Sequence, residues 1–126
     1  MARILVIDDD EIVVATIRLM LEAGGHEVRQ VEPGSVALDA LKRESIDLVI
    51  TDLLMPEQDG IEIIKQIGRL PDAPPVLAIS GGGVAGHELY LRAAGALGAA
   101  DTLPKPFTSK NLLGKVDMLL KQRKGA

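Results

Sequence analysis

Five short apolar segments recur along the 126-residue chain, and their spacing constrains the fold more than any other feature. Three of them, Ile4–Ile7, Leu48–Ile50 and Val76–Ile79, are nearly continuous in Val, Ile, Leu and Ala. Such runs are typical of strands in a parallel sheet that is covered by helices on both faces. Val28–Val31 and a weaker segment around residues 102–103 complete the set. We therefore expect five parallel strands.

Helical patterns occupy the segments between these strands. After Asp10, four apolar residues fall on one helix face, and Gly24 with Gly25 supplies a stop; the four are Val13, Ile17, Met20 and Leu21. Shorter patterns predict helices within 35–44 and around 63–67. We expect a fourth helix over 84–97, of low intrinsic stability because it contains Gly86 and Gly95.

The last predicted helix contains apolar residues for its inner face and lysines for its outer face. The inner set is Leu112, Val116, Leu119 and Leu120, and the outer set is Lys110, Lys115 and Lys121. Strand and helix then alternate five times, which predicts an α/β fold with right-handed crossovers. A barrel needs eight such units and about twice the length, so a doubly wound open sheet in one domain, residues 1–126, is expected.

Composition excludes several classes of protein. Hydrophobic residues make up 47% and charged residues 25%, as in ordinary globular domains. The absence of cysteine excludes disulfides, thiolate metal sites and a cysteine nucleophile. The net charge of −4 argues against direct nucleic-acid binding. The first apolar run stops at Asp8, so we expect no signal peptide, no membrane association and a cytoplasmic location.

Polar residues follow four of the five strands, where an open α/β sheet binds its ligands. Asp8, Asp9 and Asp10 follow the first strand, and Asp52 the third. Ser80 follows the fourth, and Lys105 the fifth. Any one of these residues could have a purely structural role, and Asp10 is a good candidate for a helix N-cap. Their gathering at one rim predicts a functional site.

The chemistry of this set is that of phosphoryl transfer. Neighbouring carboxylates repel unless a cation lies among them, and hard oxygen ligands suit Mg²⁺. A lysine supplies a mobile positive charge for a phosphoryl group. A carboxylate is the one obvious nucleophile, since aspartate can form an aspartyl phosphate.

The same residues resemble the receiver domain of two-component response regulators. The resemblance rests on Ile4–Asp10, Asp52–Pro56 with Asp59–Gly60, Ser80 and Lys105–Phe107, in that order along almost the whole chain. It implies a flavodoxin-like, five-stranded sheet of order 2-1-3-4-5 with five helices.

The resemblance also implies a role for each site residue. Asp52 would accept the phosphoryl group. Asp9 would bind Mg²⁺ directly and Asp8 mainly through water or by positioning, while Asp52 and the carbonyl oxygen of Leu54 would complete the protein ligands. These assignments are expectations that the resemblance carries.

Ser80 and Lys105 would bind the phosphoryl oxygens, and the peptide bond between Lys105 and Pro106 would be cis. Many receivers have an aromatic switch residue three positions before the lysine. This chain has Thr102 there, so its activation would be communicated differently.

The implied function is signalling, not enzymatic turnover. The chain would take a phosphoryl group from a histidine kinase or a histidine phosphotransfer protein and then bind a downstream protein. No output domain is expected within 1–126, and the resemblance allows a monomer or a phosphorylation-dependent dimer.

Two alternatives remain open. Asp8 and Asp10 also form the Asp-x-Asp pattern of haloacid-dehalogenase-like phosphatases, which use Mg²⁺ and an aspartyl phosphate. That assignment leaves Asp52 and the Met55–Pro56 pair without a role. A vestigial receiver that binds a partner constitutively is the other alternative.

Overall fold

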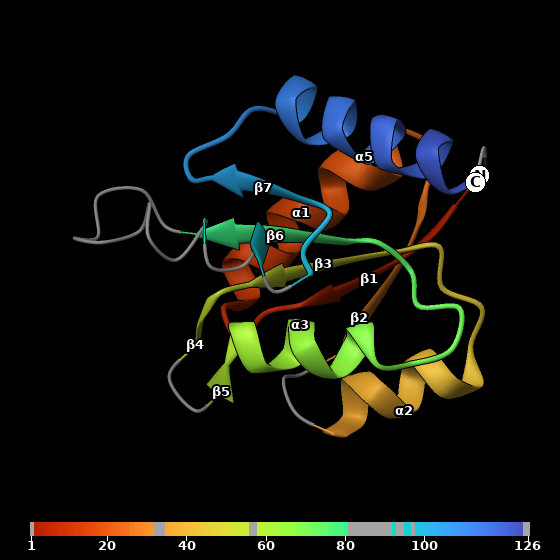
Figure 1. The fold of residues 1–126 in the computed structure, drawn as a ribbon. Helices are drawn as coiled ribbons and strands as arrows, with labels where there is room; N and C mark the ends of the chain where they lie inside the picture. The colour runs from red at the N-terminus through yellow and green to blue at the C-terminus, as the bar shows by residue number, and fades with distance from the viewer. Residues whose placement is uncertain are drawn as a thin grey trace.

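The computed structural model describes residues 2–31, 35–55, 58–80, 92, 95–96 and 98–124. A parallel five-stranded sheet lies at the centre (Figure 1), formed by β1 (Arg3–Ile7), β2 (Glu27–Val31), β3 (Leu48–Asp52), β6 (Val76–Ser80) and β7 (Asp101–Pro104). Its order is β2-β1-β3-β6-β7. Numbered along the sheet's own strands, this is the expected order 2-1-3-4-5, which confirms the flavodoxin-like topology.

The described part of the chain contains four helices, α1 (Glu11–Ala23), α2 (Ser35–Arg43), α3 (Gly60–Gly68) and α5 (Ser109–Lys124). The expected helix over 84–97 lies outside the described residues, apart from 92 and 95–96. A short antiparallel pair, β4 (Leu54–Met55) and β5 (Gln58–Asp59), precedes α3. The sequence patterns did not predict this pair, because two-residue strands are too short to show a periodic pattern.

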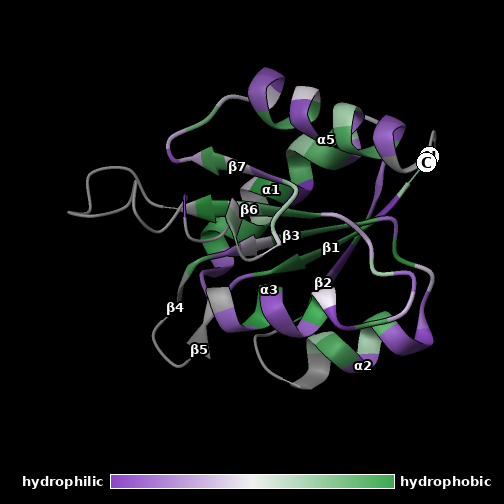
Figure 2. Cartoon of the chain, viewed as in Figure 1, coloured by the Kyte–Doolittle hydropathy of each residue, from purple (hydrophilic) through white to green (hydrophobic). Residues whose placement is uncertain are grey.

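Helices cover both faces of the sheet, with α1 and α5 on one side and α2 and α3 on the other (Figure 1). Alternate residues of β1 divide between the two resulting cores. Ile4 and Val6 pack with α1 and α5, whereas Leu5 and Ile7 pack in the second core with α2 and α3. Figure 2 shows mainly hydrophobic central strands between helices that carry both hydrophobic and hydrophilic residues. Burial on both faces explains the continuous apolar runs of the sequence.

Two details of the helices correct the sequence reading. In α1, Val14, Ile17 and Leu21 are fully buried, while Val13 and Met20 are only partly buried. The buried stripe is therefore turned slightly from the predicted one. In α5, Lys115 does not simply face solvent: its amine binds both carboxylate oxygens of Asp101 on β7, at 3.0 and 3.1 Å.

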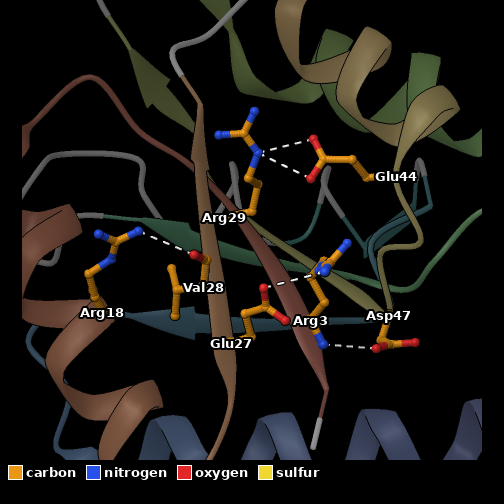
Figure 3. A network of polar contacts seen from close by, with 7 residues as sticks. All are labelled: Arg3, Arg18, Glu27, Val28, Arg29, Glu44 and Asp47. Atoms are coloured by element: carbon orange, nitrogen blue, oxygen red, sulfur yellow. Dashed lines mark hydrogen bonds and ion pairs between the residues drawn. The ribbon is translucent and has the colours of Figure 1, made fainter.

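The edge strand β2 is held by polar contacts on both sides (Figure 3). Arg18 of α1 donates a hydrogen bond to the carbonyl oxygen of Val28 at 3.2 Å. On the other side, Arg29 pairs with Glu44 at 3.0 Å. Charged groups along an edge strand discourage pairing with other chains. Within the described residues, no helix is long and apolar enough to cross a membrane.

Candidate functional site

The carboxyl ends of the central strands meet at one edge of the sheet and bring the predicted residues together. Backbone register places Asp52, the last residue of β3, beside Ile79 of β6. Ser80 is the next residue of β6 and pairs with Pro104, which directly precedes Lys105. Asp8 follows β1, whose last residue Ile7 pairs with Thr51. Strand pairing alone therefore accounts for the convergence of these four polar positions.

Lys105 and Asp52 form an ion pair at the centre of this edge. The Lys105 Nζ atom donates a hydrogen bond to Asp52 Oδ2 at 2.9 Å. The Asp52 side chain is 8% exposed and that of Lys105 is 23% exposed. The Lys105–Pro106 peptide bond is cis, as the resemblance implied. Asp52 is therefore a buried carboxylate whose negative charge is partly offset by the ammonium group of Lys105.

Asp8 is the second buried carboxylate of the site, with 5% of its surface exposed. Burial raises the pKa of Asp8 to about 6, and the charges of Asp52 and Asp9 act in the same direction. The backbone N–H of Asp10, at 2.9 Å from Asp8 Oδ1, and the ammonium of Lys105 oppose this rise. Three acids and one ammonium group therefore meet at this edge, and at Asp8 the repulsion from Asp52 outweighs the attraction of Lys105.

This excess of negative charge is what a divalent cation would offset. Within the described residues, no three Asp, Glu, His or Cys side chains form a group that could hold a metal by themselves. Mg²⁺ does not need such a group, because it commonly uses one or two carboxylates together with waters and phosphate oxygens. The buried, charge-crowded carboxylates Asp8 and Asp52, with exposed Asp9 beside them, fit that requirement.

The remaining predicted positions are placed by their backbone. Leu54 begins β4 two residues after Asp52, and the N–H of Leu53 between them donates to the Ile79 carbonyl at 2.9 Å. The side chains of Leu54 and Ser80 lie outside the described part of the structure. Thr102 is partly buried in β7, and its N–H donates to Asp101 Oδ1 at 2.7 Å.

An apolar groove beside the site was not anticipated from the sequence. It has a volume of about 460 Å³ and lies between α1 and the segment after β7, lined by Ile12, Val13, Thr16, Met20, Lys105, Pro106 and Phe107. Ile12 is 79% exposed although it is a large hydrophobic residue. The sequence feature that could have predicted the groove is Ile12, a large apolar residue that does not belong to the predicted inner face of α1.

Comparisons with curated proteins identify relatives along nearly the whole chain. The chain is 36% identical over 121 residues to the response regulator MprA of Mycolicibacterium vanbaalenii, covering 95% of this chain and 51% of that protein. Against MprA of Mycobacterium avium it is 36% identical over 123 residues, covering 97% and 52%. The chain thus spans about half the length of these relatives.

Solved structures agree in fold. A response regulator receiver domain protein from Clostridium thermocellum superposes with a TM-score of 0.88 at 30% identity, covering 98% of both chains. Full-length FixJ from B. japonicum gives a TM-score of 0.85 at 32% identity, covering 97% of this chain and 59% of that one. The family model for the response regulator receiver domain matches residues 4–117. With its sheet order and its strand-end acids and lysine, this chain belongs to the response regulator receiver domain family.

Proposed function

We propose that the chain is the phosphoacceptor receiver of a two-component phosphorelay, with Asp52 as the acceptor. The observation that carries this proposal is the buried Asp52 carboxylate held by Lys105 at 2.9 Å, beside the second buried acid Asp8. A carboxylate without Lys105 would be a poor site for a phosphoryl group, because the incoming charge would be unopposed. With Lys105, one positive group is already in place.

The proposed reaction is attack of an Asp52 carboxylate oxygen on the phosphorus of a phosphohistidine. The new bond is O–P, the bond that breaks is P–N, and the imidazole leaves with the electron pair. The donor is a histidine kinase or a histidine phosphotransfer protein. Lys105 orients the carboxylate through Asp52 Oδ2 and offsets charge on the phosphoryl oxygens.

Asp8, Asp9, Asp52 and the carbonyl of Leu54 would hold Mg²⁺ in this proposal. When bound, the cation supplies positive charge for the phosphoryl oxygens. Asp8 has a separate effect that follows from its raised pKa. Near pH 6 a proton competes for its carboxylate, so cation binding should strengthen as the pH rises above that value.

The proposed switch runs through β7 and α5. Once Asp52 is phosphorylated, Lys105 and Ser80 would move onto the phosphoryl oxygens. Lys105 directly follows β7, and Asp101 of β7 is joined to Lys115 of α5 by a two-oxygen contact. Displacement of the Lys105 segment would therefore move β7 and α5 together. This route needs no aromatic side chain at Thr102.

The groove between α1 and residues 105–107 supplies a contact surface for the phosphodonor protein. It lies beside Lys105, and Ile12 at its wall is 79% exposed. A donor histidine must approach Asp52 from outside, and an apolar surface next to its path would orient the donor. The downstream partner, the oligomeric state and the absence of nucleic-acid contacts remain predictions.

The experiment that tests the acceptor is intact mass after incubation with acetyl phosphate, with and without Mg²⁺. We expect a Mg²⁺-dependent gain of one phosphoryl group in the native protein and none in Asp52→Asn. Asp39→Asn, a change at an exposed acid of α2, should be labelled like the native protein. Labelling that persists in Asp52→Asn would contradict the assignment.

A phosphatase of the haloacid-dehalogenase type is not favoured by the comparisons, which match response regulators. In the structure Asp10 caps α1, so the second acid of the Asp-x-Asp pattern is occupied in a structural role. Steady release of phosphate from small phosphate esters by the Asp52→Asn protein would revive that alternative.

A further inference from the structure

The acidic turn between β1 and α1 is locked by consecutive side-chain hydrogen bonds. Asp8 Oδ1 accepts the N–H of Asp10 at 2.9 Å. Asp10 Oδ1 in turn accepts the N–H groups of Ile12 at 3.0 Å and Val13 at 3.4 Å. The Asp10 carbonyl accepts the first helical N–H, from Val14, at 3.0 Å. The hydrogen bonds of Asp10 therefore join residues 8–14 into one unit.

The position of the Asp9 carboxylate depends on this hydrogen-bonded unit more than the position of the Asp8 carboxylate does. Asp8 is 5% exposed, so packing holds it, whereas Asp9 is exposed. Asp9 lies between two residues that are connected by the Asp8–Asp10 hydrogen bond. An exposed side chain has few packing contacts, so the backbone of the turn sets the direction in which it leaves the chain. Whatever fixes the turn therefore fixes where the Asp9 carboxylate stands relative to Asp8.

We propose that Asp10 is a positioning residue for the cation site, which acts by capping α1 and so holding the turn that presents Asp8 and Asp9. This inference rests on the proposed function, since it assumes that these two acids bind Mg²⁺. Asp10 itself does not bind the cation in this proposal. Its carboxylate oxygen Oδ1 is engaged with the helix N-terminus instead.

The charge of Asp10 offers a competing explanation, because any nearby carboxylate attracts a cation at long range. Capping and charge can be separated by substitution. Asparagine caps helices about as well as aspartate but carries no charge, whereas alanine neither caps nor carries a charge. Ile17→Val provides the control for stability alone. Ile17 lies in the same helix and is 1% exposed. Its replacement by valine should lower the free energy of unfolding about as much as the loss of a cap, and should leave the turn unchanged.

The experiment titrates Mg²⁺ alone into the full native chain and the three variants, followed by backbone amide NMR. We expect Asp10→Ala to raise the Kd for Mg²⁺ by roughly threefold to tenfold, the size of a typical cap or supporting contact. Asp10→Asn and Ile17→Val should stay within about twofold of the native Kd. In the protein without Mg²⁺, the Asp10 amide should lose protection from hydrogen exchange in Asp10→Ala and keep it in Asp10→Asn.

Several results would overturn the inference. An unchanged Kd in Asp10→Ala would show that the turn holds without the cap. Equal weakening in Asp10→Asn would assign the effect to charge, and equal weakening in Ile17→Val would assign it to general stability. Failure of the native chain to bind Mg²⁺ would instead refute the cation site of the proposed function, and the positioning role with it. If Asp10→Ala does not fold, Asp10→Gly replaces it, because glycine costs little at a cap but supplies no side-chain acceptor.

Discussion

Removing the charge of Asp8 should make the metal-free protein more stable, and the size of the gain follows from its burial. The pKa of Asp8 is raised from 3.8 to about 6, chiefly because the carboxylate is buried. At about 1.4 kcal/mol per pH unit, this difference lowers the free energy of unfolding by about 3 kcal/mol at pH 7.5. Asp8→Asn removes that cost and keeps an oxygen to accept the N–H of Asp10.

The sign of the pH dependence is fixed by the direction of the shift. The folded protein binds the Asp8 proton more tightly than the unfolded chain does, so stability is lost as the pH rises from about 4 to above 6. The advantage of Asp8→Asn should therefore be about 3 kcal/mol at pH 7.5, about half of that at pH 5, and a few tenths at pH 4. For a domain of this size, about 3 kcal/mol corresponds to a rise in Tm of about 10 °C.

The assay is thermal and urea unfolding by circular dichroism in EDTA at these three pH values. Asp39→Asn, at an exposed site, should change stability by less than about 0.5 kcal/mol throughout. Adding Mg²⁺ should stabilise the native protein and narrow its difference from Asp8→Asn. The reasoning is refuted if the two proteins are equally stable at pH 7.5. A difference that persists at pH 4 would point to packing and not to charge.

Two further changes test the switch and the docking groove. Lys105→Ala should lower stability by about 1–2 kcal/mol, less than for a fully buried pair because Lys105 is 23% exposed. This variant should still bind Mg²⁺, but its backbone amide NMR signals in β7 and α5 should not shift when beryllofluoride, a mimic of the phosphoryl group, is added. A native-like shift would disprove the proposed coupling of Lys105 to β7 and α5. Ile12→Lys should leave Tm within about 2 °C, since its side chain is 79% exposed. Ile12→Lys should slow phosphotransfer from a donor protein, while acetyl phosphate should still label Asp52. Met118→Lys, on α5, serves as the control. Equal transfer rates in Ile12→Lys and Met118→Lys would exclude the groove as the donor surface.

Much of the fold could be predicted from local patterns because both faces of the sheet are buried. Continuous apolar runs such as Leu48–Ile50 need cover on two sides, and the helical periods between them supply that cover. The N-cap at Asp10 was also readable, since capping depends only on the residues that immediately follow. The β4–β5 pair was not, because its strands are too short for a period.

The sequence by itself determined which chemical groups stand at the strand ends: Asp8, Asp9, Asp52 and Lys105 follow directly from where the apolar runs stop. Only the tertiary structure decided how these groups interact. Lys105 is bound to Asp52 across 53 positions of chain, and burial raises the pKa of Asp8, because both effects depend on how the strands pair. The exposure of Ile12 beside the site has the same origin. Helical periodicity describes the face of α1 that packs on the sheet, but the groove exists because residues 105–107 return next to that helix.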